Sequence, residues 1–212
     1  MGYNILTMVH EYDYKPGDVI AFSGSYLGSD LINLATQGIP RWSASHVGIV
    51  ANPPSSVFIN GKRRSYRGMP IVFESYEEPE NPCVINGMMD SGVQGHNIGS
   101  RIRRYKGKVW VYPLSRTLYP HESHRLTERL FRDIDKPYDK EDVTKAGGIL
   151  LPLAFSLFRK QDFSAYFCSE LVASKLSDIG LFLTSSAGKW SPNSLVRALR
   201  KAGVIRKPIR LK

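Results

Sequence analysis

The chain has 212 residues, of which 42% are hydrophobic and 23% charged, as is ordinary for a globular protein with one full hydrophobic core. Its formal net charge of +10 favours contact with anionic surfaces, such as membrane headgroups or nucleic acid. The composition and the absence of internal repeats exclude collagen-like, coiled-coil and repeat architectures. We expect a single domain over residues 1–212, ending in a basic helix and tail.

Two features of the sequence concern where the protein works. Its first residues lack the basic and apolar segments of a secretory signal, and the longest apolar run, 147–158, is too short to span a bilayer. The two cysteines, Cys83 and Cys168, show no zinc-binding spacing and cannot build a disulfide framework. We therefore expect a cytoplasmic location, or association with a virion if the chain is viral, and neither a metal nor a cofactor.

The first predicted elements are mainly strands. A Pro-Gly-Asp turn leads into a buried strand over residues 15–24, and a short helix over 29–39 follows it. Alternating or continuously apolar patterns then predict three further strands, at 46–50, 71–76 and 108–114.

The second half of the chain is predicted to be helical. Apolar residues recur at helical spacing, with Pro120, Ser191 and Pro192 at favourable positions near helix starts. The predicted helices cover 120–134, 141–158, 167–181 and 191–204. Because strands come first and helices later, the order favours an α+β fold over alternating βαβ units.

A candidate catalytic set can be drawn from three of these elements. Cys168 stands at the predicted start of the 167–181 helix, where the helix dipole favours a thiolate nucleophile. Such a thiolate needs a histidine base, and the histidine needs an acceptor that orients it. His46, at the start of a buried strand, and Glu74, within the apolar strand 71–76, are the candidates.

Each of these residues also has an ordinary structural interpretation. Cys168 would pack as a small apolar residue, His46 would be a satisfied core histidine, and Glu74 would occupy an exposed face of its strand. Cys83 lies in a turn-rich loop without a comparable setting, and we interpret it as uninvolved.

The ordered segments "PGD", "SHVGI", "FES", "PYD" and "CSELV" resemble the NlpC-type papain-like cysteine peptidases and amidases. In the ordinary family order the cysteine precedes the histidine, whereas here His46 comes more than a hundred residues before Cys168. That order is similar to the circularly permuted branch, which includes the lecithin:retinol acyltransferase-like and YiiX-like proteins. "SPNSL" at 191–195 resembles a late segment of the family, and the resemblance covers roughly residues 15 to 200.

The resemblance implies a permuted papain-like fold, with a small antiparallel sheet or partial barrel packed against helices. It implies that Cys168 is the nucleophile, His46 the general base and acid, and Glu74 the residue that orients His46. Tyr138, Ser45 and Tyr166 are the residues it places at the substrate. The backbone N–H of Cys168, with Tyr138, would then stabilise the oxyanion. We expect Glu74→Gln to lower turnover while leaving folding nearly unchanged, because the substitution conserves volume.

The function expected from this set is a thiol hydrolase that cleaves an amide or ester bond in a peptide, amide or acyl-lipid substrate. An acyltransferase acting on a lipid, or a non-enzymatic virion or scaffold protein that keeps the fold, remains an alternative. The segments 52–70 and 147–158 depart from the family core and leave the substrate open. The basic C-terminus would either bind an anionic surface or act as a solvated tail.

Overall fold

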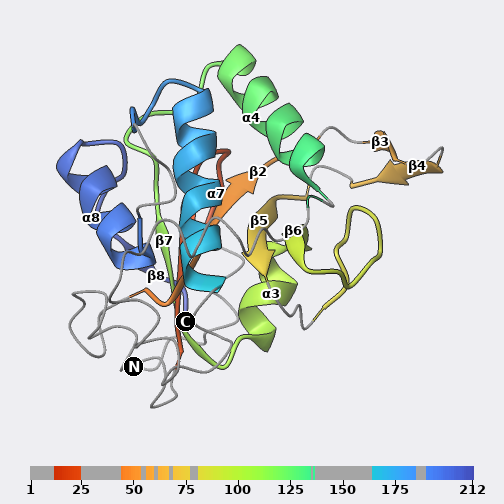
Figure 1. Cartoon of the computed structure of the whole chain (residues 1–212), viewed down its shortest axis with the longest axis horizontal. Coiled ribbons are helices and arrows are strands. Elements are labelled where there is room, and N and C mark those ends of the chain that lie inside the picture. Colours follow the sequence, from red (N-terminus) through yellow and green to blue (C-terminus); the bar gives the residue numbers. More distant parts are fainter. Residues whose placement is uncertain are drawn as a thin grey trace, which may run out of the picture.

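A computed structural model describes residues 12–24, 44–53, 56–59, 62–66, 69–76, 81–134, 136, 164–184 and 190–212. This part of the chain has an α+β fold in which an open antiparallel sheet packs against helices (Figure 1). The predicted helices at 29–39 and 141–158 lie outside the described residues.

The main sheet has six strands in the order β6-β5-β2-β1-β7-β8, and every neighbouring pair is antiparallel. Its strands are β1 (Val19–Gly24), β2 (His46–Ala51), β5 (Ile71–Tyr76), β6 (Gly92–Asn97), β7 (Gly107–Tyr112) and β8 (Ile209–Arg210). A separate hairpin of β3 (Ser56–Ile59) and β4 (Lys62–Ser65) lies within the segment 52–70.

The described helices are α3 (Ile98–Arg104), α4 (Pro120–Asp133), α7 (Ser164–Asp178) and α8 (Pro192–Lys201). Side chains cap the starts of α3 and α8 as their sequences allow. Asn97 accepts a hydrogen bond from Ser100 N at the start of α3, and Ser191 accepts one from Ser194 N at the start of α8.

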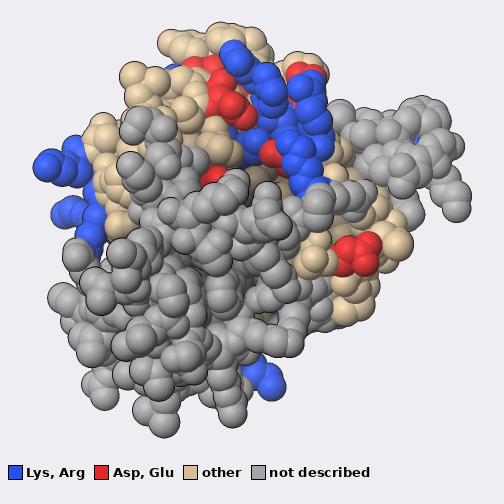
Figure 2. Space-filling view, viewed as in Figure 1, with Lys and Arg blue, Asp and Glu red and all other residues tan. Residues whose placement is uncertain are grey.

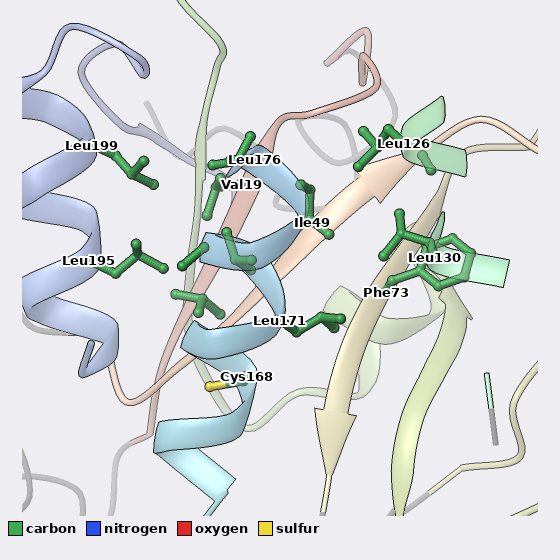
Figure 3. Close-up of a cluster of buried hydrophobic side chains, with 14 of the residues drawn as sticks. Val19, Ile49, Phe73, Leu126, Leu130, Cys168, Leu171, Leu176, Leu195 and Leu199 are labelled. Atoms are coloured by element: carbon green, nitrogen blue, oxygen red, sulfur yellow. The ribbon is translucent and has the colours of Figure 1, made fainter. Parts of the chain in front are cut away.

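Two hydrophobic layers hold the sheet between these helices. On one face, alternate strand residues such as Ile49 and Phe73 pack against α4, α7 and α8, as Figure 3 shows for Leu130, Leu171 and Leu195. The other layer joins the alternate positions of the same strands to α3 and the C-terminal end of the chain. Its members are Tyr14, Ile20, Phe22, Val50, Val72, Ile98, Ile102, Val109, Val111 and Leu211.

The predicted strands at 15–24, 46–50, 71–76 and 108–114 are all present, with bounds shifted by a few residues at most. The helix around Cys168 begins at Ser164, three residues before its predicted start, and the predicted helix 191–204 ends at Lys201. Strands β3, β4, β6 and β8 and helix α3 were not predicted. The sheet is open, with β6 and β8 at its edges, rather than a partial barrel.

Candidate functional site

The turn before β1 and the start of α8 fix the strand that carries His46. Gly17, with φ of 90°, donates its N–H to the Val50 carbonyl at 2.8 Å, and Val50 N donates to the Asp18 carbonyl at 2.9 Å. At the other end of β2, the N–H of Ala44 donates to Asn193 Oδ1 at 2.7 Å. The Pro-Gly-Asp turn and the "SPNSL" segment therefore both position the backbone around His46.

Glu74 lies close against β2 on its way to His46 because the β2 residue that faces it, Gly48, has no side chain. A Cβ added to Gly48 would lie 2.8 Å from Glu74 Cγ and 2.9 Å from the Phe73 carbonyl oxygen. Gly48 thus leaves the room in which the Glu74 side chain lies beside β2. The "HVG" segment combines an imidazole with the space for its acceptor.

The three residues expected to be catalytic come together at this point. His46 Nε2 lies 2.9 Å from Glu74 Oε2, and the His46 side chain is also hydrogen-bonded to the Cys168 side chain. His46 is 8% exposed and Glu74 and Cys168 are fully buried. Figure 3 shows Cys168 in the part of α7 that precedes Leu171. An imidazole between a thiol and a carboxylate is an arrangement typical of nucleophilic catalysis by cysteine.

Glu74 is also held by groups that sequence reasoning did not identify. Arg101 Nε lies 3.0 Å from Oε1 and 3.3 Å from Oε2, and the Tyr76 hydroxyl donates to Oε2 at 2.5 Å. The Tyr76 ring stacks on the His46 ring with centroids 4.8 Å apart. His96 Nδ1 lies 3.5 Å from Oε1. The carboxylate is therefore fixed on both oxygens.

The surrounding charges favour an imidazolium at His46 and a carboxylate at Glu74. Burial lowers the pKa of His46, but Cys168 and Glu74 outweigh burial and raise this pKa to about 9. Burial raises the pKa of Glu74, yet the positive charge of Arg101 and the hydrogen bond to His46 hold it well below its usual value. The site thus stabilises a protonated His46 paired with an ionised Glu74.

The position of Cys168 in its helix corrects one expectation. Cys168 is the fifth residue of α7 rather than the residue at its start. It therefore lies about one turn inside the helix, and the oxyanion role expected for its N–H stays a prediction.

Of the three residues expected to contact the substrate, the structure describes the side chain of Ser45 alone. The Ser45 hydroxyl donates to the Phe22 carbonyl at 3.2 Å and accepts from Gly24 N at 3.3 Å, so it also secures the start of β2. Tyr138 and the Tyr166 side chain lie outside the described residues. The substrate-binding roles of all three residues remain predictions.

The missed residues left only a weak signal in the sequence. Tyr76 follows Glu74 by two residues, so strand alternation places both on one face. Arg101 belongs to the run "RIRRYKGK", which is typical of a solvated basic patch, although Ile98 and Ile102 at helical spacing indicate an anchored helix.

Cys83, interpreted as uninvolved, is buried and accepts a hydrogen bond from Gly95 N at 3.3 Å.

Two properties of the described residues bear on metal binding and on membrane insertion. Among these residues, no three histidine, cysteine or acidic side chains are grouped so that they could hold a metal ion. None of the described helices combines the length and apolar character needed to cross a membrane.

No protein-family model matches the chain, and no curated protein sequence matches it. Among solved structures, the chain is similar to the metalloprotein YiiX from Escherichia coli O157:H7. The two are 22% identical with a TM-score of 0.45, and the match covers 80% of this chain and 68% of YiiX. A likeness of this degree establishes neither a family nor an activity.

Proposed function

We propose that the protein is a thiol hydrolase that cleaves an amide or ester bond with Cys168 as nucleophile. The observation that carries the proposal is the meeting of Cys168, His46 and Glu74, which come from α7, β2 and β5 and are hydrogen-bonded in series. A structural cysteine in an apolar core requires neither an imidazole partner nor a buried carboxylate behind it.

The proposed reaction begins when His46 takes the proton of the Cys168 thiol, to which its side chain is hydrogen-bonded. The Cys168 thiolate attacks the substrate carbonyl carbon, and the carbonyl electrons move onto its oxygen. When this tetrahedral adduct collapses, the bond to the leaving amine or alcohol breaks, and His46 protonates that group. Water, deprotonated by His46, then attacks the thioester, and the acid product and the Cys168 thiolate are released. Glu74 stays ionised and orients His46 throughout.

We further propose that the fold is the circularly permuted form of the NlpC-type papain-like fold. The support is the chain order, in which the strands with His46 and Glu74 precede the helix with Cys168. The contacts of the Pro-Gly-Asp turn and of Asn193 in "SPNSL" add to it, because both segments secure the strand of the proposed base.

Transfer of the acyl group to an amine or alcohol would use the same thioester, so the site supports both outcomes up to that step. Hydrolysis is the simpler proposal because it needs no second substrate. Product analysis in the presence and absence of an added amine separates the two reactions. A scaffold protein that only retains the fold would form no thioester.

The test is covalent labelling of the native protein with a small thiol-reactive acyl probe, read by mass spectrometry of the two cysteine peptides. Cys168 and Cys83 are both buried, so access alone predicts similar labelling of the two thiols. We expect labelling of Cys168 in the wild type and in Cys83→Ala, its loss in Cys168→Ala, and a slower rate in His46→Gln. Equal rates at the two cysteines, or an inert Cys168, would show that Cys168 is not an activated nucleophile.

A further inference from the structure

We infer that Arg101 is a positioning residue of the Cys168 site, and that it keeps Glu74 ionised and fixes the oxygen that faces His46. This role rests on the proposed function, because it describes how the acceptor of the catalytic base would be held. It gives a task to the one arginine of α3 that is buried, since Arg103 and Arg104 are exposed.

The contacts of Arg101 bear on the geometry of both Glu74 and His46. Its Nε approaches both carboxylate oxygens of Glu74, at 3.0 and 3.3 Å, and one terminal nitrogen donates to the Tyr76 hydroxyl. That hydroxyl in turn donates to Glu74 Oε2, the oxygen 2.9 Å from His46 Nε2. Because the Tyr76 ring also stacks on the imidazole, one guanidinium fixes both the acceptor and the ring that pack against His46.

The guanidinium is itself held in place before any substrate arrives. Its central carbon lies 4.7 Å from the ring centroid of Phe22, 5.2 Å from that of Tyr105 and 5.3 Å from that of Tyr76. The Arg101 side chain is 7% exposed. Buried Ile98 and Ile102 anchor α3 on the sheet, so the position of Arg101 is set by the fold. Stacking on aromatic faces and two-point contact with a carboxylate are properties of arginine that lysine does not share.

The charge of Arg101 is the first of the groups that keep this fully buried carboxylate ionised, and the others are His46 and His96, whose Nδ1 lies 3.5 Å from Glu74 Oε1. A carboxyl group out of water favours its neutral form unless a cation or hydrogen bonds offset the burial. A neutral Glu74 would be a poor acceptor for an imidazolium, and His46 would lose the group that orients it. We therefore expect the loss of Arg101 to act on His46 through Glu74.

The experiment follows the Nε2–H proton of His46 by NMR as the pH is lowered, with the signal assigned by its absence in His46→Gln. A ring N–H bonded to an ionised carboxylate gives a downfield, exchange-protected signal. In the wild type we expect this signal to persist below the usual glutamate pKa of about 4.3. In Arg101→Met it should disappear at a pH higher by about 1 to 3 units, the range for removing a close cation from a carboxyl group.

Two further variants separate charge from packing. Arg103→Met removes one exposed arginine from the same helix, and its signal should disappear at the wild-type pH. Arg101→Lys keeps the charge without the planar fork, so it should restore most of the pH range while leaving the labelling rate of Cys168 below the wild-type rate. A wild-type pH limit in Arg101→Met would overturn the inference.

The inference stays testable if Arg101→Met fails to fold. The double variant Glu74→Gln with Arg101→Met removes both charges, and it should fold if Arg101 serves to offset Glu74. If the double variant also fails to fold, Arg101 acts in packing and the inference is wrong. Absence of Cys168 labelling in the wild type would instead defeat the proposed hydrolase, while the His46 signal would still report on Arg101.

Discussion

Glu74 shows how burial changes what a single substitution is expected to do. Its volume alone suggests that Glu74→Gln leaves folding nearly unchanged. In the fold, Glu74 is fully buried and pairs with Arg101, so the amide would leave an unpaired guanidinium away from water. Breaking a buried ion pair by removing one partner commonly costs about 3–5 kcal/mol. The conservative substitution is therefore expected to be disruptive.

We predict that Glu74→Gln lowers the free energy of unfolding by about 3 kcal/mol and slows labelling of Cys168. The loss of turnover should stay below the factor of about 10⁴ seen when a serine protease loses its carboxylate, because a thiolate–imidazolium pair depends less on its third member. Denaturant unfolding and the labelling rate of the folded variant measure the two effects.

Glu128→Gln is the matched control for this prediction. It breaks a surface pair with Arg132, 2.6 Å apart, for which about 0.5 kcal/mol is expected, and it should leave labelling unchanged. If Glu74→Gln behaved like this control in both measurements, Glu74 would be neither a structural nor a catalytic anion.

At the scale of elements, the close approach of β2 and β5 depends on one glycine. A methyl group at Gly48 would meet Val72 Cγ2 at 2.6 Å, Glu74 Cγ at 2.8 Å and the Phe73 carbonyl oxygen at 2.9 Å. One of these contacts is backbone, so the strands cannot absorb the methyl group by a side-chain rotation alone. The strand that carries His46 therefore also contains the glycine that leaves space for the Glu74 side chain.

We predict that Gly48→Ala lowers the free energy of unfolding by about 1–3 kcal/mol, the usual cost of overpacking, and slows labelling of Cys168 by displacing Glu74. Gly99→Ala is the matched control, because its nearest neighbour, Arg103 Nη1 at 3.4 Å, lies at the end of a flexible side chain. Alanine at that helical position should be neutral or stabilising by up to about 1 kcal/mol. The measurements are the unfolding curves and the Cys168 labelling rates of both variants. If Gly48→Ala changed neither the free energy of unfolding nor the labelling rate, this account of the strand pair would be wrong.

The same scale shows why the sequence predicted some elements and missed others. The strand that carries Glu74 has a strong local apolar pattern, and the segment with Cys168 has the spacing of a helix. Strand β6, "GVQGHN", has neither alternation nor a continuous apolar run, and its place at the sheet edge depends on pairing with β5. Arg101 could not be assigned because its partner is 27 residues away, and a charge buried by tertiary contacts looks the same in sequence as a solvated one.

At the scale of the whole molecule, the positive charge gathers on more than one surface. Figure 2 shows lysine and arginine side chains along α4 and a second group over α8. On α8 the group consists of Arg197, Arg200 and Lys201, which are exposed and lie three or four residues apart on one helix face. The chain then continues into β8 at the sheet edge, so the fold fixes the position of this basic end.

We propose that the α8 group is where an anionic surface would bind, and we test it with vesicles that contain phosphatidylserine. Near such a surface each lysine or arginine contributes about 1 kcal/mol, so replacing Arg197, Arg200 and Lys201 by glutamine should weaken binding by roughly 100-fold. Raising the salt concentration should also weaken wild-type binding, because exposed charges are screened.

The matched control replaces Arg125, Arg129 and Arg132 on α4 by glutamine, which removes the same net charge from a different surface. A specific α8 site predicts a much smaller effect for this control, whereas equal losses would mean that only the overall charge attracts the vesicles. Wild-type affinity in the α8 variant would show that its basic residues serve as a solvated helix face.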